Sequence, residues 1–430
     1  MAESASSNCW VNVMRELEDR FRSLDRIEAP DLWNEAVGRA AALGVTRRQP
    51  LSRAWLLMAA ALLLVLLAGA ITVGTRLIWP APELPTTSYA NGMIVAQHGC
   101  GRLIGIDPTS GAERELVPSP PACGDTYQSM ETAWSADGRR LAYVLWTVCG
   151  GCVELPDPAA AYVYDVPTGE IQRVGECPEL SCAEVDISAD GSMVTYFAES
   201  MTDGRDTLTV VDVDSGRTRQ LALGGEAGSP SFSPDGTQIL LPMVGGASGL
   251  YLINTASDEL APTFLYGMVD ASDPTWSPNG EWIAFEQVSG DGTAGIWVVP
   301  ADGSEPTLLA SSPASERPGL PTWSPDSQSV AYVRTGGDSA SGAGSFQLWT
   351  VDVEGGEPSL VYESDCCIDD WRGPEWSPDG RFIAFGVHVV DDAAASGTAL
   401  IRPDGSDLRW ISEYPLEPAW QPIPIPQPAD

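Results

Sequence analysis

Lysine is absent from this chain of 430 residues, and histidine occurs only twice, as His98 and His388. Without lysine the chain can form neither a Schiff base nor a phosphate-binding P-loop, because both require that side chain. Two imidazoles are also too few for a histidine-rich zinc site. We therefore predict a non-enzymatic protein with no catalytic residues, no metal site and no resident cofactor.

Basic side chains are also scarce, since 23 arginines stand against 59 acidic residues and give a formal net charge of −36. Such a surface repels the phosphate backbone, so we predict no binding to nucleic acid. The hydrophobic content of 43% is nevertheless sufficient for a large core, and general disorder is not expected.

One segment, AWLLMAAALLLVLLAGAITVGT at residues 54–75, carries no charge at all. At about 1.5 Å rise per residue, a helix of this length crosses a hydrocarbon layer of about 30 Å. Arginines gather on its N-terminal side, whereas only Arg76 follows closely, which places the N-terminus in the cytoplasm. We predict a single-pass protein of the cell membrane with its long C-terminal part outside. A cleaved signal peptide and a buried core helix are the alternatives.

The negative charge is divided unevenly by this segment. Residues 1–53 hold eight arginines and eight acidic residues, so the excess of acid lies entirely in the extracytoplasmic part. The cytoplasmic arm also carries an apolar stripe at helical spacing. Its main members are Trp10, Met14, Leu17, Phe21 and Leu24. The stripe is consistent with a solvated spacer, or with an arm that engages a partner and resembles the short cytoplasmic arms of anti-sigma regulators.

After residue 84 the sequence repeats itself. The clearest copies are AWSADGRRLAYV (133–144), SFSPDGTQILLP (231–242), TWSPNGEWIAFE (275–286), TWSPDSQSVAYV (322–333) and EWSPDGRFIAFG (375–386). A weaker copy is DISADGSMVTYF (186–197), and AWQP (419–422) is truncated. The aligned anchors are Trp134, Ile187, Phe232, Trp276, Trp323, Trp376 and Trp420. Their spacing of 44 to 53 residues is typical of propeller blades.

Each copy predicts a tight turn followed by a buried strand. In Ser-Pro-Asp-Gly, proline presets φ, aspartate bonds nearby backbone and glycine accepts a positive φ. The turn residues are Asp137, Gly138, Asp235, Gly236, Asn279, Gly280, Asp326, Asp379 and Gly380. Two further strands complete a four-stranded sheet that must stack on its neighbours to bury both faces.

These copies resemble the TolB-type propeller repeat, a relative in architecture of the WD40 propellers. The resemblance covers about residues 90–422. The N-terminal α/β domain of TolB itself is missing, and the predicted membrane anchor stands in its place. Three strands at 90–117 lack a first strand, which residues 418–421 supply, so we predict an all-β, seven-bladed propeller, with six blades as the alternative.

The predicted organisation has five parts. They are a cytoplasmic helical arm (1–53), a transmembrane helix (54–76), a linker (77–89), the propeller (90–422) and a proline-rich tail (423–430).

The blade layout places the unusual residues on one face of the ring, where second strands meet third strands and blades connect. The candidate interaction face comprises His98, Cys100, Cys123, Cys149, Cys152, Cys177, Cys182, Cys366, Cys367, Asp369, Asp370, His388, Asp391 and Asp392. We also expect long loops there, at 146–160, 334–345 and 388–397.

Eight cysteines outside the membrane favour disulfides, since an even number in an oxidising compartment normally pairs. The local candidates are Cys149 with Cys152, Cys177 with Cys182 and Cys100 with Cys123, and a vicinal bridge at Cys366 and Cys367. Pairing between blades, a redox role for Cys149 and Cys152, and a zinc site remain alternatives. His98 and His388 fall in adjacent blades and are predicted to be rim residues or to share a site.

Three functions follow from these features. The first is a non-enzymatic module that binds or scaffolds a protein, peptide or other ligand through its loop face. The second is a transmembrane sensor whose cytoplasmic arm engages a regulator. The third is a propeller lyase or hydrolase, which two histidines and the absence of a GxSxG motif disfavour. The sequence leaves the oligomeric state open.

Overall fold

The computed structural model describes fifteen stretches of the chain. They are residues 89–98, 102–118, 127–129, 131–148, 159–177, 181–199, 206–223, 227–243, 248–267, 271–288, 293–313, 316–338, 343–389, 397–413 and 418–425. The predicted cytoplasmic arm, with its stripe from Trp10 to Leu24, and the predicted transmembrane helix lie outside them. Within these stretches there is no helix that is long and apolar enough to cross a membrane.

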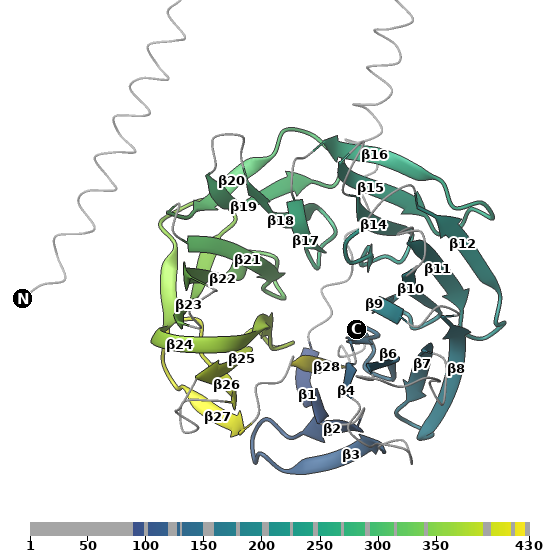
Figure 1. Ribbon diagram of the computed structural model, residues 1–430, viewed down its shortest axis with the longest axis horizontal. Helices are drawn as coiled ribbons and strands as arrows, with labels where there is room; N and C mark the ends of the chain where they lie inside the picture. Colours follow the sequence, from purple (N-terminus) through teal and green to yellow (C-terminus); the bar gives the residue numbers. More distant parts are fainter. Residues whose placement is uncertain are drawn as a thin grey trace, which may run out of the picture. The chain divides into compact units, whose positions relative to one another are not determined.

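The described residues form 28 strands arranged as a ring of sheets (Figure 1). The first sixteen are β1 (Tyr89–His98), β2 (Arg102–Ile106), β3 (Glu113–Val117), β4 (Tyr127–Ser129), β5 (Thr132–Trp134), β6 (Arg140–Val148), β7 (Ala160–Asp165), β8 (Glu170–Glu176), β9 (Ser181–Ile187), β10 (Met193–Glu199), β11 (Thr207–Asp212), β12 (Thr218–Ala222), β13 (Ser231–Phe232), β14 (Gln238–Met243), β15 (Gly249–Asn254) and β16 (Pro262–Gly267). The others are β17 (Ala271–Trp276), β18 (Trp282–Val288), β19 (Ala294–Pro300), β20 (Thr307–Ser311), β21 (Glu316–Trp323), β22 (Ser329–Asp338), β23 (Ala343–Asp352), β24 (Ser359–Trp376), β25 (Ile383–Val389), β26 (Gly397–Ile401), β27 (Arg409–Ser412) and β28 (Ala419–Pro424).

These strands make seven antiparallel blades of four strands each. Blade 1 has the order β28-β1-β2-β3, and blades 3, 4 and 5 are β9–β12, β13–β16 and β17–β20. In blade 2 the innermost strand is divided into β4 and β5, which both pair with β6. Blades 6 and 7 share β24, whose first half pairs with β23 and whose second half pairs with β25. The predicted seven-bladed fold is confirmed, and the six-bladed alternative is wrong because the weak copy at 186–197 builds a complete blade.

The ring closes where the two ends of the propeller sequence meet. Strand β28 pairs antiparallel with β1, and Tyr89 lies opposite Pro424 in the register. The predicted contribution of the last repeat to the first blade is therefore confirmed. Because this pairing uses both ends of the ring, unfolding either end exposes a sheet edge.

The turns form because one serine hydroxyl and one aspartate carboxylate satisfy the local backbone. In blade 4, Ser233 Oγ donates to Asp235 Oδ1 over 2.6 Å and accepts the Gln238 N–H over 3.0 Å. The Thr237 N–H also donates to Asp235 Oδ1. Gly236 then has a φ of +70°, which glycine adopts without a steric penalty.

Two departures from the Asp-Gly part of the motif, Asn279 and Ser327, keep this geometry. In blade 5, Asn279 Oδ1 accepts from Ser277 Oγ and from the Glu281 N–H, as aspartate does elsewhere. In blade 6, Ser327 takes the left-handed conformation of the missing glycine, with a φ of +60°. Its hydroxyl accepts the Asn279 N–H from the neighbouring turn, which offsets part of the strain.

The hydrophobic core lies between neighbouring blades rather than within one sheet. Between blades 6 and 7, Phe346 stacks on Phe385 with ring centroids 5.9 Å apart, and both side chains are fully buried. The small residue before each aromatic, such as Ala384, is also fully buried and lets the sheets approach closely. The anchor tryptophans add links between blades, since Trp323 Nε1 donates to the Thr275 carbonyl of the preceding blade.

Candidate functional site

The two faces of the ring differ in the loops that they carry. The turn face carries the turns from first to second and from third to fourth strands, for example at Gly236 and at Asp302. The connector face carries the loops from second to third strands and the connections between blades, for example at Thr293 and Pro313. The predicted interaction face is this connector face.

The backbone places several predicted residues at the connector face. His98 ends β1, and His388 lies near the end of β25 on the neighbouring blade. Asp370 of β24 is the register partner of His388. Cys366, Cys367 and Asp369 also lie in β24, so the expected connector between blades 6 and 7 is a continuous strand. The remaining members, Cys100, Cys123, Cys149, Cys152, Asp391 and Asp392, fall outside the described residues.

One predicted disulfide is present at this face. Cys177 and Cys182 are bonded, with Cα atoms 5.6 Å apart, and both are fully buried. Cys177 follows β8 of blade 2, and Cys182 lies in β9 of blade 3, so the bond joins two blades at their connection. It does not form a reactive thiol site.

One expected loop is wrong. Residues 334–345 were predicted to form a long loop, but β22 and β23 continue through most of this stretch as a paired hairpin. The register runs without interruption from Ser329 opposite Asp352 to Asp338 opposite Ala343. The glycines and serines of this segment did not show a strand pattern because they lack the apolar alternation of a half-buried strand.

A set of carboxylates on the innermost strands was not predicted. Glu131, Glu184 and Asp273 each lie three residues before an anchor, and the register of β9 and of β17 shifts at this place. Glu184 and Asp273 have φ values of +56° and +51° there. Glu131 accepts the Glu184 N–H, and Glu184 accepts from Ser229 Oγ, so each carboxylate contacts the next blade. Because these carboxylates lie the same number of positions before their anchors in the sequence, this spacing could have predicted them.

Burial changes the acidity of three carboxyl groups on or beside the innermost strands, of which only Asp273 occupies this third position. Burial raises the pKa of Asp186 to about 7, although its carboxylate accepts the N–H groups of Phe232 and Ile187. Burial also raises the pKa of Asp273, against hydrogen bonds from Ser272 and Leu320. Glu286 has a raised pKa for the same reason, with a further contribution from Asp273. These contacts link inner strands, which is a structural use of the carboxylates.

The residues that the structure describes contain no group of three or more His, Cys, Asp or Glu side chains that could hold a metal ion. Strained conformations and shifted pKa values mark functional sites in many enzymes, but ion and hydrogen-bond networks also produce them. In this ring the positive φ values of Glu184, Asp273 and Leu320 recur at the third residue before an anchor, which indicates a property of the repeat.

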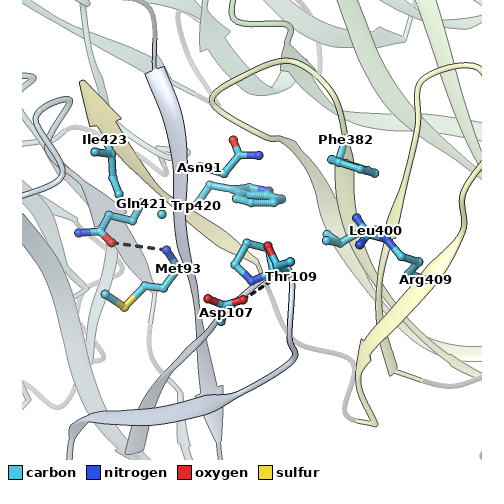
Figure 2. Close-up of a pocket in the computed structure, with 12 residues that line it drawn as sticks. Asn91, Met93, Asp107, Thr109, Phe382, Leu400, Arg409, Trp420, Gln421 and Ile423 are labelled. Carbon is cyan, nitrogen blue, oxygen red and sulfur yellow. Dashed lines mark hydrogen bonds between the residues drawn. The ribbon is translucent and has the colours of Figure 1, made fainter. Parts of the chain in front are cut away.

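A cavity of about 340 Å³ lies on the turn face where blade 7 meets blade 1 (Figure 2). Blade 7 contributes Phe382, Leu400 and Arg409 to its wall, and blade 1 contributes Asn91, Asp107 and Trp420 among others. None of the predicted site residues except the anchor Trp420 lies here. The cavity was missed because its wall joins residues from opposite ends of the repeat sequence.

The described residues thus form a closed, seven-bladed propeller. Propellers of this class present loops from the two faces of a rigid ring. The model of the TolB beta propeller domain matches residues 123–338, about half of the chain. The chain belongs to the TolB beta-propeller family.

Comparison with known proteins extends this likeness. The uncharacterized protein Atu1656 of Agrobacterium fabrum is 28% identical over 201 residues, which are 46% of this chain and 62% of that protein. The chain thus spans less than two thirds of the length of this curated relative.

Among solved structures, a puromycin-hydrolyzing peptidase of Mycobacterium tuberculosis matches 78% of this chain and 55% of its own, with a TM-score of 0.52 and 16% identity. The oligogalacturonate lyase of Vibrio parahaemolyticus matches 75% of this chain and 85% of its own, with a TM-score of 0.51 and 13% identity. At these identities the likeness is one of fold.

Proposed function

We propose that this protein is a membrane-anchored, extracytoplasmic propeller that binds a protein or peptide partner through its connector face and catalyses no reaction. The proposal combines the family fold with the charge-free segment at residues 54–75. A ring whose strands are all paired is a rigid frame, and rigid frames position binding loops well.

The observation that carries the proposal is the place where the chain enters and leaves the ring. Tyr89 begins β1 opposite Pro424 near the end of β28, and both lie at the turn face. A linker at residues 77–89 would therefore tether the turn face to the membrane. The connector face lies on the opposite side of the ring and is left open to a large partner.

Charge and covalent structure support the same face. Residues 77–430 contain 51 acidic residues and 14 arginines, which favours a partner with a basic surface. The bond between Cys177 and Cys182 fixes one blade connection at this face. A loop that is held in one conformation loses less entropy when a partner binds.

The test is co-purification of the full-length protein from native membranes with substitutions that introduce positive charge on each face. On the connector face Thr293 and Pro313 are exposed and are changed to arginine. Asp302 and Glu354 on the turn face are also exposed. In the matched variants they are likewise changed to arginine. Loss of a stoichiometric partner only in the connector-face pair supports the proposal. Equal recovery with all four variants overturns it.

The apolar stripe of the cytoplasmic arm favours a second candidate, a transmembrane sensor whose arm engages a cytoplasmic regulator. Its members recur at three- and four-residue spacing from Trp10 to Leu24. Deletion of residues 1–45 separates the two functions. A purely extracytoplasmic scaffold keeps its phenotype after this deletion, whereas a sensor loses it even though the propeller still binds its partner.

A further inference from the structure

One position on the outermost strands divides the blades into two kinds. The fourth strand of each blade lies on the outside of the ring, as β8, β12 and β16 show in Figure 1. We call the rim residue the residue of this strand that lies opposite one equivalent residue of the third strand. In blades 1 to 7 the pairs of third-strand and rim residues are Ile104–Glu115, Tyr162–Arg173, Thr209–Gln220, Tyr251–Phe264, Trp297–Leu308, Trp349–Leu360 and Ala399–Trp410.

The rim residues of blades 4, 5 and 6 are apolar and open to solvent. Phe264, Leu308 and Leu360 are 58%, 42% and 44% exposed, and each lies opposite a partly buried aromatic residue of the third strand. In blade 4 the two rings meet edge to face, since the centroids of Tyr251 and Phe264 are 5.6 Å apart. Single exposed apolar side chains are common on proteins, but blades 1 to 3 carry polar residues at this position. Recurrence in three consecutive blades therefore indicates a surface, which we call the apolar rim.

The main chain beside the apolar rim is interrupted. The residue after each rim residue has no partner in the register of the third strand, so the outer strand bulges at Leu265, Leu309 and Val361. A bulge at an edge breaks the regular row of donors and acceptors that an added strand needs. A partner of the apolar rim therefore binds its side chains and does not extend its sheets.

The surroundings of the apolar rim are acidic. Residues 227–364, which cover most of blades 4 to 6, contain 17 acidic residues and two arginines. Glu259, Glu305 and Glu357 are exposed and precede the rim residues of their blades by three to five positions. None of these three carboxylates forms an ion pair with a residue that the structure describes. The apolar rim thus favours a partner with positive charge.

Arginines mark the limit of this acidic surface. In blade 6 the guanidinium carbon of Arg334 lies 4.3 Å from the centroid of the Trp349 ring, and its Nη2 donates to the Ser311 carbonyl of blade 5 over 3.0 Å. In blade 7 the rim residue Trp410 is apolar too, but it directly follows Arg409. The combination of apolar and negative surface is therefore strongest on blades 4 and 5 and ends at blade 6.

We propose that the apolar rim of blades 4 to 6 binds a basic, amphipathic helix of a partner protein. The apolar face of the helix covers the rim residues, and its lysine or arginine side chains face the unpaired glutamates. A second copy of this chain is a poor occupant, because two acidic surfaces repel each other. The apolar rim lies on the outside of the ring, so its binding does not depend on a partner at the connector face.

The test measures binding of a fluorescent peptide to the purified full-length protein in a nonionic detergent by fluorescence anisotropy. The probe is a peptide of leucine and lysine with leucine at helical spacing. One control peptide has serine in place of leucine, and the other has glutamate in place of lysine. We expect the probe to bind at least about tenfold more tightly than either control, because binding uses both apolar burial and charge.

The first set of variants locates the binding. The combined change Phe264→Ser, Leu308→Ser and Leu360→Ser removes the apolar rim at exposed positions and is expected to weaken probe binding at least about tenfold. The matched control changes the rim residues of blades 1 to 3 to serine and leaves probe binding unchanged.

A second variant tests the charge without any change in the apolar surface. Glu259→Gln, Glu305→Gln and Glu357→Gln together are expected to weaken probe binding by about threefold or more, since each exposed ion pair contributes little. This variant also decides if the serine variant fails to fold. Equal binding of the three peptides, or equal loss in the control variant of blades 1 to 3, overturns the proposal. Self-association of the wild type that the serine variant loses also overturns it, since the occupant is then a second copy.

Discussion

Tyr89 and Pro424 lie opposite each other in the antiparallel pair of β1 and β28, although 335 positions separate them in the sequence. Their pairing closes the ring and places its entrance and exit at the same face. The proposed binding through the connector face depends on this relationship. It also means that in blade 1 the first and second strands, β28 and β1, are held together without a turn that joins them.

Removal of residues 419–430 is therefore expected to destabilise the whole ring. It exposes the edge of β1 and removes Trp420, which is 3% exposed, and also the Gln421 Nε2–H donation to the Gly138 carbonyl of blade 2. We expect a broad thermal transition and a Tm lower by about 10 °C or more, since loss of a packed strand costs several kcal/mol. Circular dichroism measures this. Removal of residues 426–430 is the control, and an equal Tm for both truncations contradicts closure by β28.

Phe385→Ala tests the position of the core between blades. The ring of Phe385 is fully buried and packs on Phe346 and Tyr362 of the neighbouring blade. We expect the free energy of unfolding to fall by about 3–5 kcal/mol. Phe264→Ala, at a side chain that is 58% exposed, is expected to cost about 0.5 kcal/mol or less. Denaturant titration of both variants gives the comparison, and similar losses would show that the core lies elsewhere.

Asp186→Asn tests the buried carboxyl between blades 3 and 4. Burial raises the pKa of Asp186 to about 7 in the folded protein, from an ordinary value of 3.8. The folded state then binds more protons than the unfolded state, so this group makes the protein less stable as the pH rises from about 4 to 7. Asparagine can still accept the Phe232 N–H but carries no charge.

The measurement is the free energy of unfolding of both proteins between pH 4 and pH 8. We expect the variant to become more stable relative to the wild type as the pH rises, by up to about 4 kcal/mol. A constant difference across this range would show that Asp186 titrates at its ordinary pKa.

Several of these features follow from the sequence and others do not. The repeat predicts the blades because turn residues such as Asp235 and Gly236 act locally, and Asn279 and Ser327 replace their counterparts without loss of the turn. The closure of the ring by the last repeat is predictable because the three strands at 90–117 lack a first strand. The continuous β24 is not predictable, since its middle residues show neither a turn nor an apolar alternation.

The cavity where blade 7 meets blade 1 is also beyond sequence reasoning. Asn91 and Arg409 stand 318 positions apart, and neither belongs to the repeated motif. The cavity depends on the volume that one junction leaves unfilled, which is a property of three-dimensional packing. The disulfide was one of several pairings that the sequence allowed, and the distance between Cys177 and Cys182 selects it.

Replacement of Cys177 and Cys182 by alanine is expected to weaken the link between blades 2 and 3. The bond closes a loop with a sequence separation of 5, and the entropy of such a loop corresponds to about 2 kcal/mol. Peptide mapping without reduction should recover the two cysteines in one linked peptide. Recovery of both as free thiols, with unchanged stability of the variant, contradicts the assignment.

Photo-crosslinking in native membranes tests the central claim most directly, because it reports which face of the ring meets a partner. A photoreactive amino acid is placed at Thr293 or Pro313 on the connector face, and at Asp302 or Glu354 on the turn face. The account predicts one protein adduct of the same size from both connector-face positions and none from the turn face. Adducts from the turn-face positions alone would contradict it.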